Sequence, residues 1–180
     1  MGPLPTTGLS DLSQILWRER ETLELVLFKL EEQRLLLVDG QDRWVGHASR
    51  ELDTVLDRLG AMELNRALAS AAAAAELGVR DDAGLRDLAA AAPAPWPSVI
   101  ERHVCALVRL AQEIVAVAGA NRALLSQGLA AVRTSMNGRA SRPSTRMLVD
   151  VAGYHAALAT NERVLQPSLV DAVRGPHPPS

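Results

Sequence analysis

The stretch of sequence that decides the fold is residues 9–38, LSDLSQILWRERETLELVLFKLEEQRLLLV. Its apolar residues recur at steps of three and four, which places them on one stripe of an α-helix. Within this stripe only Glu19 and Gln33 are polar. The pattern predicts a long helix over about residues 10–39, ended by a left-handed turn at Gly40. The members of the stripe are Leu9, Leu12, Leu16, Leu23, Val26, Leu30 and Leu37.

A second helical pattern follows after a short reversal, over about residues 42–77. Because the connection is so short, the two helices should form an antiparallel hairpin. Ser10 or Asp11 is expected to cap the first helix. Gly60, inside the second pattern, indicates a close approach of two backbones or a local bend. The apolar stripe of the second helix comprises Val45, Ala48, Leu52, Val55, Leu59, Met62, Ala69 and Ala73.

The rest of the chain predicts one more long helix and a tail. A short helix over residues 85–92 precedes a Pro-rich break, and a third long helix follows over residues 98–137. Residues 138–180 are expected to form a flexible tail, in which a helix at 146–165 is mobile or loosely docked until a partner orders it. The alternative is a disordered terminus with no role. The helical domain thus spans residues 9–137. The fold class is all-α: a long antiparallel helical hairpin plus a third long helix, like an extended bundle or coiled coil, with a flexible C-terminal tail.

Charge and composition narrow the class of partner. The 180 residues contain 19 basic and 21 acidic side chains, a net charge of -2, so no large basic field favours nucleic acid. Residues 1–8 lack the charged start and apolar stretch of a signal peptide and are expected to be disordered. No uninterrupted apolar run reaches the roughly 18 residues of a membrane span. We therefore expect a soluble cytoplasmic protein that binds no nucleic acid and does not insert into a membrane.

Residues that could carry chemistry do not gather into a motif. None of the 4 histidines follows a glutamate by three residues, so the Glu-x-x-His pairs of a di-iron bundle are missing. On a helix His103 and Cys105 point to different faces, and we expect a partly buried histidine and a core thiol rather than zinc ligands. Phosphate-binding and nucleophile-elbow motifs are also missing. No metal, cofactor or catalytic residue is predicted, and the chain is not expected to be an enzyme.

Charged residues on the first two helices are expected to lie in solvent. Arg20 with Glu24, and Glu31 with Arg34, have the spacing of helix salt bridges. An all-helical enzyme that holds a carboxylate-bearing metabolite would need arginines that converge on one interior pocket, but the spacing spreads those of the second helix along its polar side. The residues concerned are the glutamates Glu19, Glu21, Glu24, Glu31 and Glu32 and the arginines Arg43, Arg50, Arg58 and Arg66.

Apolar side chains exceed what three helices can bury. Residues 35–38 cover every side of the last turn of the first helix, and Trp44 across the turn is the natural cover for them. Trp17 and Phe28 also lie at the edge of the main stripe. A second copy of the chain, the tail or a helix of another protein should therefore pack on these faces.

Several sequence blocks follow one another along about residues 9–136: LWRERE at 16–21, LFKLEE at 27–32, LLL at 35–37, Trp44, ELG at 76–78, APAPW at 92–96 and NRALL at 121–125. In their order and spacing these blocks resemble the FlgN-type flagellar export chaperones of actinobacteria. The resemblance implies a cytoplasmic chaperone without catalytic activity. Such a chaperone binds hook-filament junction (hook-associated) proteins, prevents their premature assembly and delivers them to the flagellar type III export gate.

The resemblance places client binding toward the C-terminal helix, where an amphipathic client helix would lie in a groove between long helices. The alternative is a self-associating coiled-coil or bundle adaptor, which pairs with a second copy as a homodimer and has no export role. Asn121, polar within an apolar stripe, would set the register of packing. By position, the partner-binding residues are Asn121, Leu124, Leu125, Gly128, Val132 and Met136, with Leu148, Val151 and Tyr154 in the tail.

Overall fold

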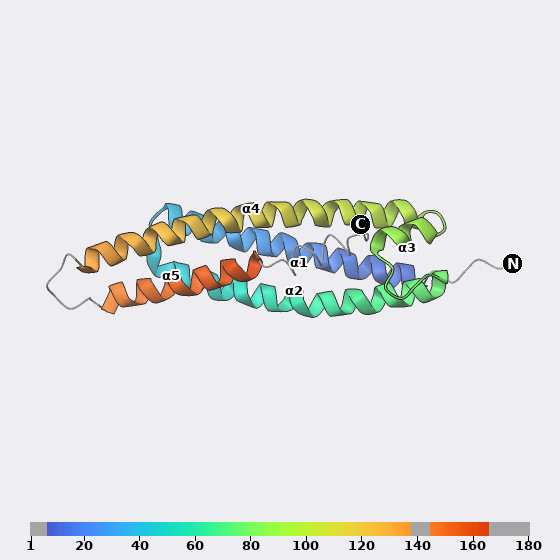
Figure 1. Ribbon diagram of the computed structural model, residues 1–180, viewed down its shortest axis with the longest axis horizontal. Coiled ribbons are helices and arrows are strands. Elements are labelled where there is room, and N and C mark those ends of the chain that lie inside the picture. The colour runs from blue at the N-terminus through green and yellow to red at the C-terminus, as the bar shows by residue number, and fades with distance from the viewer. Residues whose placement is uncertain (1–6, 138–144, 166–180) are drawn as a thin grey trace. The chain divides into compact units, whose positions relative to one another are not determined.

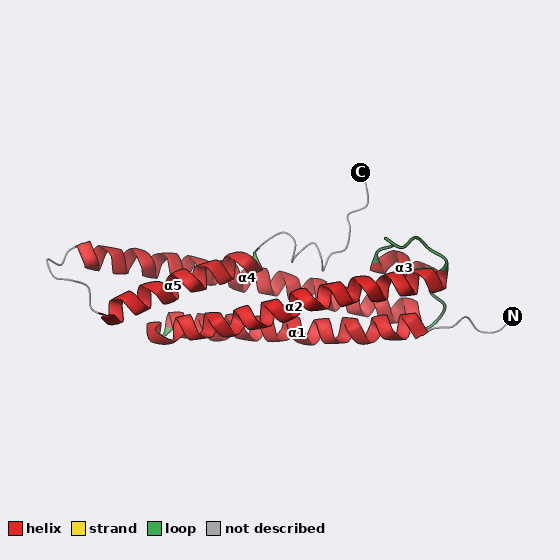
Figure 2. Ribbon diagram, turned by 90° about the horizontal axis from the view of Figure 1, so that it is seen from below, coloured by secondary structure: helices red, strands yellow, loops and turns green. Residues whose placement is uncertain are grey.

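The computed structural model describes residues 7–137 and 145–165, with side chains over 7–135 and 151–165. Figure 2 shows helices joined by loops, and no strand, in this part of the chain. The all-α class expected from the sequence is therefore confirmed. The helices are α1 (Thr7–Val38), α2 (Asp42–Leu77), α3 (Leu85–Ala91), α4 (Trp96–Asn137) and α5 (Thr145–Val164).

The first helix begins earlier than the sequence pattern predicts. α1 starts at Thr7, so residues 7 and 8 are helical rather than disordered, while residues 1–6 lie outside the described part. The cap also differs from the expected Ser10 or Asp11, because the backbone N–H of Gly8 donates to Glu76 Oε1 at 2.8 Å. A carboxylate near the last turn of α2 thus satisfies an amide that α1 itself leaves open.

Two glycines end the long helices of the hairpin. Gly40 and Gly78 both have φ of +67°, the left-handed conformation that glycine adopts without a Cβ clash. After each, the next backbone N–H donates five residues back, from Gln41 to Leu36 at 2.8 Å and from Val79 to Ala74 at 3.0 Å. This is the Schellman arrangement. The left-handed turn expected at Gly40 is confirmed.

The described residues divide into two compact units. Unit 1 comprises residues 7–24 and 57–111, and unit 2 comprises residues 25–56, 112–137 and 145–165. The helices α1, α2 and α4 are each divided between the two units, whereas α3 belongs to unit 1 and α5 to unit 2. Each unit has buried apolar side chains of its own.

Unit 1 buries the first half of the α1 stripe. Leu12 and Leu16 have no exposed surface, nor has Ile100 of α4 or Leu88 of the short α3. Each leucine buried to this extent stabilises the fold by about 2 kcal/mol. The predicted stripes of α1 and α4 therefore face each other in this unit, and α3 closes part of the core.

Unit 2 contains the antiparallel turn of the hairpin. Lys29 Nζ lies 2.5 Å from Glu51 Oε2, and Gln33 Nε2 donates to Ser49 Oγ at 3.0 Å. From the first of these contacts to the second, the residue number rises along α1 and falls along α2. The two helices are therefore antiparallel here. Leu30 and Val45 are fully buried between them and the second half of α4.

Helix α5 packs against the other helices of unit 2 (Figure 1). Tyr154, Ala157 and Val164 have exposed fractions of 6%, 0% and 0%. The sequence led us to expect a mobile or loosely docked segment here, because a helix of 20 residues is marginal on its own in water. The difference comes from the buried face and the hydrogen bonds of α5, which its local pattern does not reveal. The expected linker at 138–144 and the end of the tail at 166–180 lie outside the described residues.

Close backbone approach occurs at different glycines from the one expected. Gly60 is exposed, and a Cβ there would meet nothing within 4 Å. A Cβ on Gly46 of α2, by contrast, would lie 3.1 Å from Cα of Gly153 in α5. This pair of glycines lets α5 lie close against α2, which supports the packing of the last helix in unit 2.

Candidate functional site

The residues predicted to bind a partner lie on the second half of α4 and on α5, both in unit 2. Three of them are buried. Leu125 and Tyr154 belong to one apolar cluster with Val45, Leu129 and Ala157. Asn121 is fully buried and donates to the Leu30 backbone oxygen at 2.8 Å. Because these three residues are buried, they pack beneath the surface and expose little area that a partner could contact.

The other predicted residues form an accessible edge between α4 and α5. Leu124, Gly128, Val132 and Val151 are half-buried. Val151 packs against the cluster that contains Leu125 and Tyr154, as does Leu158 about two turns further along α5. Met136 belongs to α4 and Leu148 to α5, but their side chains lie outside the described residues.

Gly128 is the point where α4 and α5 come closest. A Cβ on Gly128 would lie 2.3 Å from Tyr154 Cε1, so only glycine leaves room for the tyrosine ring. The Tyr154 hydroxyl in turn donates to Asp42 Oδ1 at 2.7 Å. One side chain of α5 therefore contacts α4 through its ring and α2 through its hydroxyl.

The variant Gly128→Ala is expected to lower the free energy of unfolding by about 1 to 2 kcal/mol, because the ring must move and its bond to Asp42 breaks. Gly119→Ala is the matched control on the same helix, since a Cβ there meets nothing within 4 Å. That control should gain about 0.5 to 1 kcal/mol from better helix propensity. Urea denaturation of both variants measures the difference, and a stabilised Gly128→Ala protein would contradict the packing described.

A buried amide network joins all four helices of unit 2. Gln33 Nε2 donates to Ser49 Oγ at 3.0 Å, and Gln33 Oε1 accepts from Asn121 Nδ2 at 3.1 Å and Asn161 Nδ2 at 2.7 Å. All four side chains have no exposed surface. Asn161 escaped notice in the sequence, although it continues the inward stripe of Tyr154 and Ala157 at helical spacing. Asn121 is a buried member of this network, and its register-setting role stays a prediction.

A second polar contact fastens α5 to α2. Asp53 accepts from Thr160 Oγ1 at 2.9 Å and forms an ion pair with Arg163 Nη1 at 2.7 Å. Thr160 is buried, Asp53 is half-buried and Arg163 is exposed. The contact between α5 and α2 therefore includes polar interactions, which fix the register of the two helices in addition to their apolar packing.

Unit 1 contains a buried carboxylate. Glu19 was expected in the solvated face of α1, but only 1% of its side chain is exposed, and its Oε2 lies 3.2 Å from Arg66 Nε. Neither of these two atoms has a hydrogen bond of good geometry. Burial raises the pKa of Glu19 from 4.5 to about 7, outweighing the lowering by Arg66, and the nearby Glu63 raises it further.

The remaining charged residues follow the predicted solvated pattern. Arg20 pairs with Glu24 at 2.8 Å, and Arg34 lies 3.7 Å from Glu31. Of the arginines that an enzyme pocket would need, only Arg66 turns inward, toward Glu19, while the others are exposed. The three exposed ones are Arg43, Arg50 and Arg58.

His103 and Cys105 do not form a metal site. His103 is buried, with Nε2 lying 3.2 Å from Ser13 Oγ, and burial together with Arg20 and Arg102 lowers its pKa below 6.5. Cys105 is exposed, which corrects the expected core thiol. Among the described residues no group of three His, Cys, Asp or Glu side chains could hold a metal ion.

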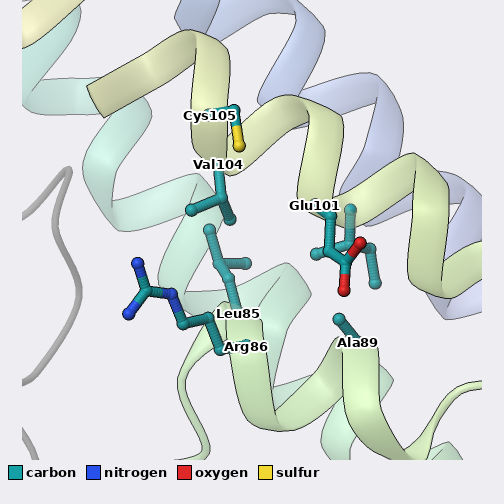
Figure 3. Close-up of a pocket in the computed structure, with 7 residues that line it drawn as sticks. Leu85, Arg86, Ala89, Glu101, Val104 and Cys105 are labelled. Carbon is teal, nitrogen blue, oxygen red and sulfur yellow. The ribbon is translucent and has the colours of Figure 1, made fainter. Parts of the chain in front are cut away.

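A cleft opens between α3 and α4 in unit 1 (Figure 3). Leu85 and Val104 form its apolar part, and Figure 3 shows Arg86 and Glu101 on opposite sides of it. One charge of each sign beside a small apolar floor selects no particular class of ligand. The cleft is completed by Ala89, Ile100 and Cys105.

Large apolar side chains remain exposed, as the surplus in the sequence predicts. Trp44 does not cover the end of α1: its indole is 48% exposed and its ring contacts are with His47 and Arg43 of its own helix. Leu35 and Val38 are left 69% and 68% exposed. The full set comprises Trp17, Phe28, Leu35, Val38, Trp44, Leu64 and Leu68.

Within the described part of the chain, one helix is long and apolar enough for a membrane span. It is Trp96–Ser135 of α4, and 44% of the most apolar window is buried inside the structure. The core helix of a soluble protein has the same length and composition.

Comparison with known proteins addresses the family directly. A family model described as FlgN protein matches residues 1–148, which include α1 to α4 and the start of α5. Comparison with the curated proteins found no significant match, and comparison with the solved structures found none either. Because the match spans more than half of the 180 residues, the chain belongs to the FlgN family of flagellar export chaperones.

Proposed function

We propose that this chain binds hook-filament junction (hook-associated) proteins in the cytoplasm, prevents their premature assembly and delivers them to the flagellar type III export gate. The general chaperone role follows from the family, and the finer assignment rests on one observation. This is the half-buried apolar edge that Leu124, Val132 and Val151 form along α4 and α5.

The edge suits an amphipathic client helix. Leu124 and Val132 lie one helical turn before and after Gly128 on α4, and the Tyr154 ring packs over that glycine between them. Burying the remaining exposed surface of Leu124, Val132 and Val151 under a client would add up to about 1 kcal/mol for each. Asn121, Leu125 and Tyr154 hold the edge rigid from below. Met136 and Leu148 are proposed to extend it toward the connection between α4 and α5.

Two single variants, Leu124→Asp and Val151→Asp, test this proposal. Each should weaken binding to purified hook-associated proteins of the same organism at least about tenfold, because a carboxylate would be desolvated in the contact. Leu68→Asp is the control, since Leu68 is a 64% exposed leucine on α2 in unit 1. Calorimetry gives the affinities, and circular dichroism checks that each variant is folded. Unchanged affinity in both variants would move the client site elsewhere, and no binding by the wild type would refute the function.

A self-associating adaptor remains the second candidate, because seven large apolar side chains are exposed among the residues whose side chains the structure describes. In that case the apolar faces would pair with a second copy of the chain. Light scattering separates the two proposals: a tight dimer that persists when a hook-associated protein is added favours the adaptor. A monomer that forms a stoichiometric complex with the client favours the chaperone.

A further inference from the structure

The outer face of α1 in unit 2 combines apolar and acidic residues. Phe28, Leu35 and Val38 are 61%, 69% and 68% exposed. At 100° per residue they share an arc of about 120° with the carboxylates of Glu31 and Glu32, and Asp39 follows the helix directly. We refer to this face as the α1 end patch; its residues are Phe28, Glu31, Glu32, Leu35, Val38 and Asp39.

A shallow groove runs through the patch. It is lined by Glu32, Leu35 and Asp39, with Leu36 and Gln41 completing it. Aliphatic walls between two carboxylates match the side chain of Lys or Arg, which has an apolar stem and a cationic head. The Phe28 ring already attracts a cation, since Lys29 Nζ lies 5.7 Å from its centroid.

The negative charge of the patch is only partly offset within the chain. Lys29 lies between Glu32 and Glu51, and Arg34 is 3.7 Å from Glu31. Asp39 Oδ2 accepts from the neutral Gln41 amide at 3.1 Å. In addition, α1 has no basic residue in its last turn, so the negative end of its dipole is not countered there.

We propose that the α1 end patch is a docking surface for a partner protein's helix that carries Lys or Arg beside an apolar stripe. This surface lies on a different helix from the proposed client edge, so the inference goes beyond the proposed function. A second copy fits poorly, because a symmetric contact would place carboxylates against carboxylates. The segments outside the described residues fit less well: 1–6 has no Lys or Arg, and 138–144 has two arginines but no large apolar residue. In 166–180 a single arginine, Arg174, follows Leu169, Val170 and Val173, but Asp171 offsets its charge.

Paired synthetic peptides test the proposal on the full chain. Both are helices of about 20 residues with leucine at heptad positions a and d, flanked in one by lysine and in its twin by glutamate. Fluorescence anisotropy should show at least about tenfold tighter binding of the lysine peptide. The double variant Leu35→Ser/Val38→Ser should lose at least about tenfold in affinity for it. Asp39→Lys should reduce the preference for lysine over glutamate.

Leu64→Ser/Leu68→Ser is the matched control, because both leucines are 64% exposed but lie on α2 in unit 1. The control should bind the lysine peptide as the wild type does. Equal binding of the two peptides, or equal losses in the patch and control variants, would overturn the proposal. So would a wild-type dimer that the patch variant abolishes, which assigns the patch to a second copy. The patch variant should still bind hook-associated proteins; if it does not, the client itself occupies the patch.

Discussion

Replacing Gln33 by leucine is expected to lower the free energy of unfolding by about 3 kcal/mol, because three buried polar groups each lose a partner. The hydroxyl of Ser49 and the amides of Asn121 and Asn161 all contact the Gln33 side chain. Each keeps one backbone contact, to Val45, Leu30 and Ala157 respectively, which limits the loss at each site. For a domain with a stability of about 5 to 15 kcal/mol this remains a large effect.

Urea denaturation followed by circular dichroism measures this loss. Gln14→Leu is the control, since Gln14 is exposed on the same helix, and it should change stability by no more than about 0.5 kcal/mol. The double variant Gln33→Leu/Asn161→Leu should lose less than the sum of its single variants, because removing both partners leaves fewer orphaned groups. A stable Gln33→Leu protein would mean that the network adds nothing to unit 2.

Helical periodicity was sufficient to predict the long elements of this fold. Leucines at steps of three and four, with Gly40 after the last of them, are local signals that need no knowledge of the rest of the chain. The structure accordingly has α1, α2 and α4 within about three residues of the expected positions. Exposed apolar side chains, such as Phe28 and Leu35, were also predictable, because the sequence has more apolar residues than three helices can bury.

The polar interior could not be predicted from the same pattern. Glu19 and Gln33 stood out as interruptions of the α1 stripe, but their partners come from other helices: Arg66, and Asn161 at 128 residues' separation. A charged residue is usually solvated, so burial of Glu19 was the less expected outcome. The space for Tyr154 over Gly128 likewise exists only once α4 and α5 lie together. The sequence therefore predicted a helix at 146–165 that is mobile or loosely docked, but not the contacts that α5 makes.

The buried Glu19 is expected to make stability depend on pH. Burial raises the pKa of Glu19 from 4.5 to about 7 in the folded state, so between these values the folded chain holds a proton that the unfolded chain has lost. Stability from this group is therefore full below pH 4.5 and declines as pH rises through about 7. The expected loss is about 3 kcal/mol between pH 4.5 and pH 8. Burial raises the pKa of Glu63 too, which adds to the decline, whereas the lowered pKa of His103 opposes it.

Glu19→Gln isolates the contribution of this carboxyl, because glutamine imitates its protonated form. Denaturation at pH 5 should give nearly the same stability for variant and wild type, whereas at pH 8 the variant should be more stable by about 3 kcal/mol. Glu21→Gln, an exposed change two residues away on α1, should leave the difference between the two pH values as in the wild type. The opposite result for Glu19→Gln, lower stability at pH 8, would mean that attraction to Arg66 outweighs the cost of burying the charge. In that case Glu19 and Arg66 would act as an ion pair that stabilises unit 1 rather than as an acid held neutral by its surroundings.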